Sequence, residues 1–412
     1  MAVLEQDTEI ISELVLEANL PAEKSRKTVD RFDLKGVSLI TFAHGLHDTY
    51  SSWLSALLPV LIEKFTLTNT MAGALSMALT FPSVLLPIIG YTADRKNLRW
   101  LIVIAPAITA LVMTNLGVIP SYGLLFPFIM LAGLSAGGIH AVGPGVVSHF
   151  AGKSIGKGMS FWMIGGEFGY SVGPLLATSM VGLIGFSRMP LLAIGGILVS
   201  LFLVYATRDV DTRTVKQELK IVRPAFMQNL KHVMFPMVML LLTRALAGVM
   251  LSTFMPIFLR SQGASLGFAG AGMAITGAAG AVGSYIAGTQ SDKLGHRKIL
   301  AVAIIITPIF MLLFLNTEGW LKIPLLILSG LFGLSMFPVM MSTIIKFFPE
   351  DRSFANGIFM SINFIIQSLG ALGAGRIADL KGMPFAFTVA AMAMPLGLLA
   401  LLLMPKGYKA QE

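Results

Sequence analysis

Long apolar runs separated by short polar segments fill the chain between residues 35 and 405. A helix of about twenty apolar residues crosses a bilayer, and the runs have that length. Short segments of alternating polarity, which would indicate a membrane β-barrel, are not seen in the sequence. We therefore predict an all-α integral membrane protein with twelve transmembrane helices, at 35–62, 71–93, 99–119, 122–150, 157–184, 189–207, 234–260, 266–290, 298–316, 322–348, 354–377 and 384–404.

A charged linker after the sixth predicted helix divides the spans into two groups of six. The linker starts at Arg208 and is too short to form a domain. Before the first span, an apolar stripe beside Glu9, Glu13 and Glu17 predicts a short amphipathic helix rather than a signal peptide. The predicted units are a cytoplasmic leader with this helix at 1–34, an N-terminal six-helix bundle at 35–207, a cytoplasmic linker at 208–233, a C-terminal six-helix bundle at 234–405 and a cytoplasmic tail at 406–412.

The distribution of Lys and Arg predicts the orientation of the chain. If the N-terminus is cytoplasmic, the inside segments carry 23 of the 30 Lys and Arg residues, the outside loops carry six, and Arg244 lies within a span. Cytoplasmic loops of membrane proteins are enriched in these residues. We therefore expect a multi-pass protein of the plasma (inner) membrane with both termini in the cytoplasm.

Composition supports the membrane assignment and narrows the chemistry. Of the 412 residues, 55% are hydrophobic and 12% charged, and the mean hydropathy is +0.79. The net charge of +9 does not indicate nucleic-acid binding, because the cations lie in loops between apolar spans. The absence of cysteine excludes disulfides, thiol catalysis and thiolate metal sites.

A polar stripe runs along the first predicted helix, in the segment TFAHGLHDTYSSWLS from residue 41 to residue 55. An ionised side chain at the centre of a bilayer costs roughly 2.5–3.5 kcal/mol, so such a stripe predicts a pathway or a binding face. On a helical wheel an arc of roughly 140° contains Thr41, His44, His47, Asp48, Ser51, Ser52 and Ser55.

Five ionisable residues from four predicted helices lie at similar depth. At 1.5 Å per residue, Asp48, His44, Glu167, Arg244 and His140 lie about 13–18 Å from the cytoplasmic ends of their helices. Transporters built from repeats bind substrate and coupling ions near this depth, between the repeats. We therefore predict that the five residues meet near the midplane.

Each of these residues has a predicted role and a structural alternative. A buried acid held by hydrogen bonds, a structural histidine or a permanent ion pair of Arg244 would account for the same residues without function. We predict proton coupling by Asp48, Glu167, His44 and His140, and substrate binding by Arg244, His47, Ser51 and Tyr170. Arg244 stays charged, so it needs an anion, either a substrate group or one of the carboxylates.

A loop sequence occurs twice, 198 residues apart. GYTADRKNLR begins at Gly90 and GTQSDKLGHRK at Gly288, and a weaker copy, GRIADLKG, begins at Gly375. We expect the glycines to permit close helix contact and each aspartate to accept hydrogen bonds from a neighbouring helix N-terminus. The predicted gating residues are Gly90, Asp94, Arg95, Gly288, Asp292, Lys293 and Arg297.

A glycine face is predicted on the fifth helix. Gly165, Gly169 and Gly173 recur every four residues, and Pro174 follows. Small residues at this spacing let two helix backbones approach closely, and the proline favours a kink.

The repeated loop and the six-plus-six layout resemble the major facilitator superfamily over residues 35 to 405. Within it the chain is similar to the fosmidomycin-resistance group, in HGLHD, in GGIHAVGP, in GKGMSFWMIGGEFGYSVGPLL, in SMFPVMM and in GALGAGRIAD. The resemblance implies two pseudo-symmetric six-helix bundles and an exporter that uses the proton gradient to expel small toxic compounds. Glu167 and the acidic leader depart from the group's pattern, so we do not carry over a substrate.

These observations predict a proton-coupled antiporter that exports a small organic compound, with Arg244 indicating an anion. A proton-coupled uptake symporter remains open, as does a divalent metal-ion carrier with histidine and carboxylate ligands, against which the charge of Arg244 argues. A membrane enzyme or receptor lacks support, because no nucleophile elbow, phosphate loop or zinc signature occurs. We predict no cofactor and no resident metal. The expected partners are a small-molecule substrate, protons and the lipid bilayer, without nucleic acid, and we expect a monomer.

Overall fold

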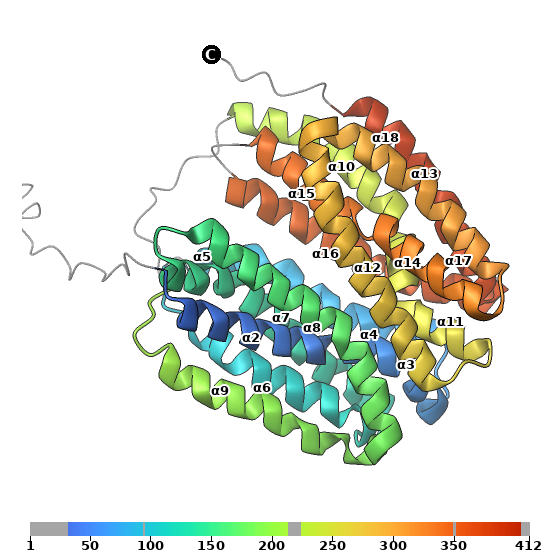
Figure 1. Cartoon of the computed structure of the whole chain (residues 1–412), viewed down its shortest axis with the longest axis horizontal. Helices are drawn as coiled ribbons and strands as arrows, with labels where there is room; N and C mark the ends of the chain where they lie inside the picture. Colours follow the sequence, from blue (N-terminus) through green and yellow to red (C-terminus); the bar gives the residue numbers. More distant parts are fainter. Residues whose placement is uncertain (1–31, 94, 213–223, 349–351, 405–412) are drawn as a thin grey trace, which may run out of the picture.

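The computed structural model describes residues 32–93, 95–212, 224–348 and 352–404. Predictions for nearly all of the leader, for Asp94, for residues 213–223 of the linker and for the tail fall outside these residues. Every regular element in the described part of the chain is a helix, which confirms the all-α fold class. Figure 1 shows the helices gathered into two groups, one from blue to green and one from yellow-green to red.

The first group, the N-terminal half, comprises the described residues 32–212. Its helices are α2 (Leu34–Ser51), α3 (Trp53–Phe65), α4 (Asn69–Thr80), α5 (Leu86–Ala93), α6 (Trp100–Thr114), α7 (Tyr122–Ala151), α8 (Ile155–Ile184) and α9 (Ala193–Ala206). Three 3₁₀ segments join or extend them at Phe81–Leu85, Asn115–Gly117 and Phe186–Leu192.

The second group, the C-terminal half, comprises the described residues 224–404. Its helices are α10 (Pro224–Val249), α11 (Met255–Ser261), α12 (Leu266–Leu294), α13 (His296–Leu315), α14 (Lys322–Gly333), α15 (Met336–Phe347), α16 (Arg352–Lys381), α17 (Met383–Ala393) and α18 (Gly397–Leu403). A π-helical turn at Met250–Phe254 joins α10 to α11, and 3₁₀ turns lie at Gly319–Leu321 and Met394–Leu396.

Ten helical stretches of the described residues are long and apolar enough to cross a bilayer. This criterion supports a multi-pass membrane protein but does not reach the predicted count of twelve. The two predicted spans missing from the ten, 35–62 and 157–184, are helical in the structure as α2 with α3 and as α8. These two spans carry the polar residues of the candidate site, and polar residues lower their mean hydropathy.

Short local signals start and end the helices. The carboxylate of Asp33 accepts hydrogen bonds from the backbone N–H groups of Lys35 and Gly36, which caps the N-terminus of α2. Between α12 and α13, Gly295 has a φ of +90°, a conformation that glycine adopts at no steric cost. The chain therefore reverses there in a single residue.

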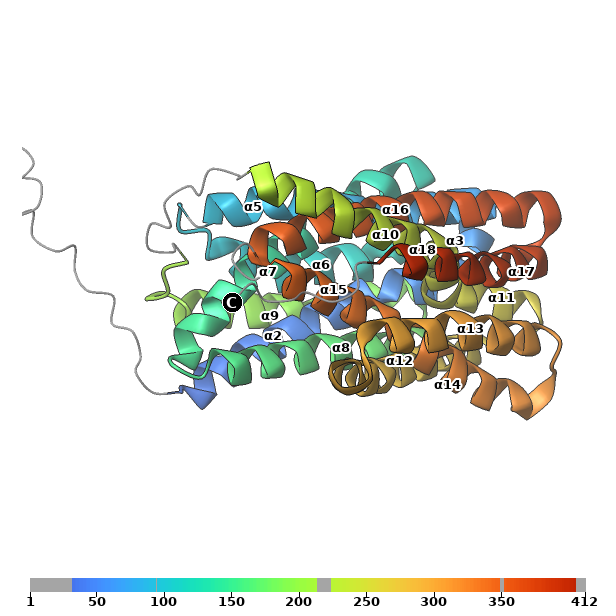
Figure 2. The ribbon, with the colours of Figure 1, turned by 90° about the horizontal axis from the view of Figure 1, so that it is seen from above.

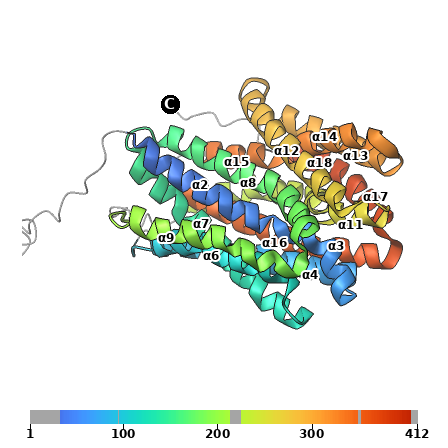
Figure 3. The same ribbon diagram turned by 60° about the horizontal axis from the view of Figure 1, so that its bottom comes forward.

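Helices α2 and α8 run side by side (Figure 3) and pack backbone against backbone. A Cβ at Gly165 would meet the carbonyl oxygen of Thr41, and one at Gly169 would meet that of Gly45. At Gly173 it would meet Ser52. The predicted close-packing face of the fifth span is thus confirmed, and it lies against the helix that carries the polar stripe.

The two halves join firmly at one end, which we call the Asp379 end, where α3 ends at Phe65 and α4 begins at Asn69. Here the Arg260 guanidinium of α11 donates to the Glu63 carboxylate of α3 at 2.9 Å. The opposite end, where α12 ends at Leu294, we call the Asp292 end. The ribbons of the two halves diverge toward the Asp292 end (Figure 1).

Asp379, at the C-terminal end of α16, caps the N-terminus of α4 across the two halves. Its carboxylate accepts hydrogen bonds from the backbone N–H groups of Asn69 (2.7 Å) and Thr70 (2.9 Å) and from both of their side chains. The next N–H group, that of Met71, donates to the Thr68 hydroxyl. The first three N–H groups of α4 therefore all have acceptors, and Asp379 of the C-terminal half accepts from two of them.

A Gly169→Ala substitution tests whether the glycine face of α8 holds α2 in place. The new methyl group would meet the Gly45 carbonyl oxygen, which belongs to the backbone and cannot rotate away. We expect the free energy of unfolding to fall by about 1–3 kcal/mol, the usual cost of overpacking. Thermal or denaturant unfolding of the purified protein in detergent measures this loss.

Gly182→Ala is the matched control on the same helix, because a Cβ at Gly182 would meet nothing within 4 Å. Alanine has a higher helix propensity than glycine, so this variant should be as stable as the wild type or gain up to about 1 kcal/mol. Equal losses in the two variants would contradict the role of close packing at Gly169.

Candidate functional site

Three histidines surround the carboxylate of Asp48 in the N-terminal half. His44 Nε2 lies 3.2 Å from Asp48 Oδ2, and His140 Nε2 and His47 Nε2 lie 3.8 and 3.9 Å from Asp48 Oδ1. His44, His47 and Asp48 come from α2, and His140 comes from α7. The polar stripe of the first span and the histidine of the fourth thus meet as predicted. Ligand atoms of His44, Asp48 and His140 all lie within 4.8 Å of one another, so this group could hold a metal ion.

The backbone of α8 fixes the protonation pattern of His44. His44 Nδ1 lies 2.9 Å from the carbonyl oxygen of Trp162. A carbonyl oxygen only accepts, so Nδ1 carries the hydrogen and donates it. In a neutral His44, Nε2 therefore presents a lone pair to the Asp48 carboxylate, which also has only lone pairs. The 3.2 Å contact is favourable only when a proton, or another cation, lies between the two side chains.

Trp162 and Gly166 shape the pocket of His44. The His44 ring stacks on the indole of Trp162, with centroids 3.7 Å apart and the planes 6° from parallel. A Cβ at Gly166 would lie 2.5 Å from His44 Cε1 and 2.8 Å from Asp48 Oδ2. A side chain at this position would thus displace the pair. Our sequence reasoning missed both residues, although they lie in the motif that suggested the family.

A chain of hydroxyl groups orients His47. Ser135 Oγ donates to the carbonyl oxygen of Ala105, and Thr109 Oγ1 donates to Ser135 Oγ. The hydroxyl hydrogen of Thr109 is then used, so His47 Nδ1, at 3.1 Å, donates to Thr109. His47 Nε2 is left as an acceptor, with the Ser51 hydroxyl 3.4 Å away. Thr109 and Ser135 were not predicted, although each is a lone hydroxyl in an apolar run.

Glu167 lies on α8 and faces the C-terminal half. Ser171 and Pro174, one and two turns further along the same helix face, contact Gly277 and Gly270 of α12. The Glu167 side chain is exposed and has no hydrogen bond or ion pair among the described residues. Its charge lies within electrostatic range of Asp48 and His44. Glu167 therefore belongs to the edge of the Asp48 cluster that faces the other half.

Tyr170 lies one turn from Glu167 and is also exposed, by 41%. Its hydroxyl is within electrostatic range of both Asp48 and Glu167. No hydrogen bond of this side chain is formed within the described part of the chain, which leaves the phenol free to contact a ligand. Of the predicted substrate residues, His47, Ser51 and Tyr170 thus lie at the Asp48 cluster.

Arg244 lies in a different group of residues, in the C-terminal half. Its side chain is buried, with 5% exposed. Its Nη1 donates to Asn363 Oδ1 of α16 at 3.4 Å. Helix α10, which carries Arg244, and α16 run side by side (Figure 2). The guanidinium also lies 5.5 Å from the ring centroid of Phe337. The predicted meeting of Arg244 with the Asp48 cluster is wrong for this conformation. Depth gave its height in the bundle but not its neighbours.

The buried guanidinium of Arg244 has no carboxylate partner among the described residues. Its Nε has no hydrogen-bond partner, and the contact with Asn363 is long. A buried cation without a counter-ion is costly, so this arrangement favours an anion as its missing partner. Asn363 and Phe337 were not identified from the sequence.

The glycines of the repeated loop do not make the predicted close contacts. A Cβ at Gly90 or Gly288 would meet nothing within 4 Å, so that explanation is wrong for this conformation. Asp94 lies outside the described residues. Arg95 lies in the turn after α5, where it stacks on the Tyr91 ring and donates to the Tyr91 carbonyl of that helix.

Asp292 has a different partner from the one predicted. Its carboxylate accepts from Lys346 Nζ of α15 at 2.7 Å and lies 3.9 Å from His296 Nε2, rather than capping a helix. Lys293 is exposed, and two guanidinium nitrogens of Arg297 are buried and have no hydrogen-bond partner within the described part of the chain. The predicted cap occurs instead in the weaker copy of the loop, at Asp379.

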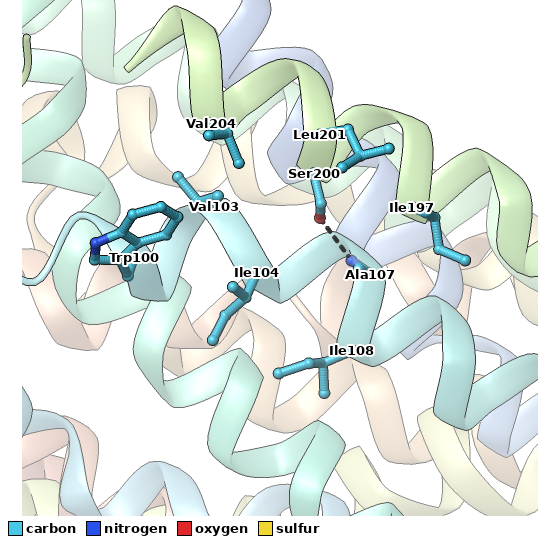
Figure 4. Close-up of a pocket in the computed structure, with 9 residues that line it drawn as sticks. All are labelled: Trp100, Val103, Ile104, Ala107, Ile108, Ile197, Ser200, Leu201 and Val204. Atoms are coloured by element: carbon cyan, nitrogen blue, oxygen red, sulfur yellow. Dashed lines mark hydrogen bonds between the residues drawn. The ribbon is translucent and has the colours of Figure 1, made fainter. Parts of the chain in front are cut away.

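A groove between α6 and α9 is separate from the polar cluster (Figure 4). Its one side-chain hydroxyl, that of Ser200, accepts a hydrogen bond from the Ala107 N–H group at 2.9 Å. The apolar lining suits a hydrocarbon chain and offers no charge to a polar ligand. The groove is lined by Trp100, Val103, Ile104, Ala107, Ile108, Ile197, Ser200, Leu201 and Val204.

The sequence matches one protein-family model and is similar to a named resistance protein along nearly its whole length. The sequence model of the Major Facilitator Superfamily matches residues 39–317 and 237–412. The chain is 23% identical over 395 residues to the fosmidomycin resistance protein of Escherichia coli (strain K12), covering 94% of this chain and 97% of that protein.

Two solved structures share the fold. A bacterial homologue of the human lysosomal transporter Spinster superimposes with a TM-score of 0.71 at 15% identity, covering 92% of this chain and 96% of that one. A D-xylose–proton symporter superimposes with a TM-score of 0.70 at 15% identity, covering 90% and 98%.

The structure predicts that one histidine of the cluster is open to a water-borne reagent. His140 and His44 have exposed side-chain fractions of 37% and 4%, and His47 is fully buried. Diethyl pyrocarbonate should therefore modify His140 about tenfold faster than His44, in proportion to these fractions. Mass spectrometry of the labelled protein in sealed vesicles and in detergent measures the rates. Equal rates for the three histidines would contradict the described cluster.

Proposed function

The chain belongs to the Major Facilitator Superfamily of membrane transporters, and from this premise we propose that it is a proton-coupled antiporter that exports a small organic anion. In the proposed cycle Asp48, with His44, His140 and Glu167, carries the proton. Arg244 binds the substrate anion, together with Tyr170, His47 and Ser51. The similarity to the fosmidomycin resistance protein supports export as the direction.

The contact between His44 and Asp48 is the observation that carries the proposal. Because Nδ1 of His44 is committed to the Trp162 carbonyl, the pair needs one added proton to be stable at 3.2 Å. Loss of this proton leaves two acceptors face to face in a site with little water. Gain and loss of one proton thus change the energy of a contact within α2, and His44 of this pair is also bonded to the backbone of α8. We propose that the proton is coupled to the packing of the two helices through this bond.

Substrate coupling follows from the separation of the charges. Arg244 lies in the C-terminal half and Asp48 in the N-terminal half, with Glu167 on the face between them. An anion held by Arg244 stabilises the arrangement in which no carboxylate approaches the guanidinium. Once the substrate leaves, Glu167 or Asp48 becomes the available anion for Arg244. We propose that substrate and deprotonated carboxylate compete in this way for one cation.

We also propose gates at both ends. In the described conformation the Asp379 end is closed by the cap on α4 and by the Glu63–Arg260 pair. Opening this end must break these bonds. At the other end Asp292 and Lys346 stay within the C-terminal half. We propose that Asp94, Arg95, Lys293 and Arg297, with the small residues Gly90 and Gly288, take part there when the halves close.

Asp48→Asn tests the coupling. In proteoliposomes with a pH gradient, a panel of small phosphonates including fosmidomycin, carboxylates and hydrophobic cations should reveal a substrate whose entry releases protons from wild-type vesicles. Because the amide can donate to His44 Nε2, Asp48→Asn removes the need for the shared proton. We expect substrate binding to persist while substrate-dependent proton release falls to background.

Two further variants sharpen the coupling experiment. Glu167→Gln shows whether Glu167 contributes to proton coupling independently of Asp48. The matched control is Asp209→Asn, because Asp209 is an 88% exposed acid paired with its neighbour Arg208. Proton movement in the same direction as the substrate would replace the antiporter by a symporter. Unchanged pH dependence in both the Asp48 and the Glu167 variants would contradict the proposed coupling.

Asp379→Ala tests the gate at the Asp379 end. The substitution removes four hydrogen bonds from the start of α4. Loss of a cap costs about 1 kcal/mol, enough to shift the ratio of closed to open molecules several-fold. The natural chain has no cysteine, so spin labels can be attached at Val118→Cys and Gln262→Cys alone. Double electron–electron resonance should show a larger population at long distance.

The control for the gate is Asp209→Ala, which removes an exposed acid remote from this end. Its distance distribution should match that of the unmodified labelled protein. An identical distribution in Asp379→Ala would show that the cap does not hold this end closed.

A further inference from the structure

We propose that His44, Asp48 and His140 form a binding site for a divalent transition-metal ion of the Zn²⁺ class. The sequence analysis predicted no resident metal, but the geometry brings two imidazole nitrogens and a carboxylate oxygen within 4.8 Å of one another. Tetrahedral zinc with bonds of about 2.0–2.2 Å holds its ligand atoms about 3.4 Å apart. His44 Nε2 lies 3.2 Å from Asp48 Oδ2 and His140 Nε2 lies 3.8 Å from Asp48 Oδ1, so each nitrogen is near that spacing from one oxygen of the carboxylate.

The orientation of His44 is an independent indication of a cation. Its Nε2 is buried, has no hydrogen-bond partner among the residues that the structure describes and lies toward Asp48 and His140. Its Nδ1 donates to the Trp162 carbonyl. Metal-binding histidines characteristically donate their second ring N–H to a backbone carbonyl or a carboxylate, which directs the lone pair of the other nitrogen at the metal. His44 already has this arrangement.

His47 extends the set without being required. Its Nδ1 donates into the Thr109 and Ser135 hydroxyl chain, which leaves Nε2 as a lone pair 3.9 Å from Asp48 Oδ1. The three-residue set leaves a fourth tetrahedral position, which His47 or a water molecule can fill. The partly exposed His140 places this position where an ion can enter from water.

The ligand types select the class of ion. Imidazole nitrogens suit zinc, copper, nickel and iron, whereas Mg²⁺ and Ca²⁺ require mainly oxygen ligands. No Lys or Arg of the described residues forms an ion pair with Asp48, and the nearby Glu167 adds negative charge. An ion in this position satisfies the two facing acceptors in place of the shared proton. Metal and proton therefore compete for one site.

The binding experiment uses the full chain purified in detergent with an affinity tag that contains no histidine. Isothermal titration with Zn²⁺ should give one ion per chain, with affinity falling as the pH is lowered and protons released on binding. Metal ligands and their supporting residues change affinity by about 10–100-fold when removed. We therefore expect at least tenfold weaker binding in His140→Ala, whose partly exposed side chain makes loss of the fold a small risk.

Two controls make the experiment decisive. His232→Ala removes an exposed histidine of α10 and should bind Zn²⁺ like the wild type. Gly166→Ala places a methyl group against His44 and Asp48 and should weaken binding, whereas Gly182→Ala on the same helix should not. Excess Mg²⁺ should not displace the bound ion. Absence of stoichiometric Zn²⁺ binding, or equal affinity in the wild type and His140→Ala, would overturn the metal site.

The outcome is independent of the transport proposal. Zinc binding with no proton-coupled flux would support this site and remove the proposed antiport. Proton-coupled flux without zinc binding would support the proposed antiport and remove the metal site. Where both occur, Zn²⁺ should inhibit substrate-dependent proton release in the wild type, and His140→Ala should need at least tenfold more Zn²⁺ for the same inhibition.

Discussion

The contact between His44 and Asp48 sets the chemistry of the molecule. Two side chains that would both present lone pairs are held 3.2 Å apart, and the Trp162 carbonyl prevents His44 from turning its N–H toward the carboxylate. In water such a pair would separate or exchange protons freely. Inside a helix bundle the contact is favourable only with a proton or another cation between the two side chains, and the proposed proton and metal sites both rest on this requirement.

The close packing of α8 against α2 provides the surroundings that the contact between His44 and Asp48 requires. Glycines at 165, 169 and 173 bring α8 within backbone distance of α2. The same approach places the Trp162 carbonyl against His44, and the absence of a side chain at Gly166 leaves room for the imidazole and the carboxylate. Packing and chemistry are therefore not separable here, because one helix interface provides the stability, the tautomer and the space.

The sequence predicted the parts that depend on periodicity and depth. The polar stripe of the first span and the depth of His140 placed the Asp48 cluster, and the glycine spacing predicted a close-packing face on α8, although not its partner α2. Depth could not place Arg244, because the rotation of α10 and the position of the opposite half are not encoded in a 1.5 Å rise. The hydrogen bond to His44 uses the backbone carbonyl of Trp162, which any residue would supply, and the stacking of its indole on His44 depends on the contact between the two helices.

The loop repeat illustrates a second limit of sequence reasoning. The two clear copies predicted helix caps. Asp94 of the first copy lies outside the described residues, and Asp292 of the second pairs with Lys346. A cap forms at Asp379 in the weakest copy, between the halves. An aspartate in this motif caps a helix only when the relative position of the two halves brings an N-terminus to it. In this conformation Asp379 caps a helix of the other half, whereas Asp292 pairs with a lysine of its own half. The proposed alternating access depends on such a difference, since caps between the halves at both ends at once would hold the halves closed on both sides.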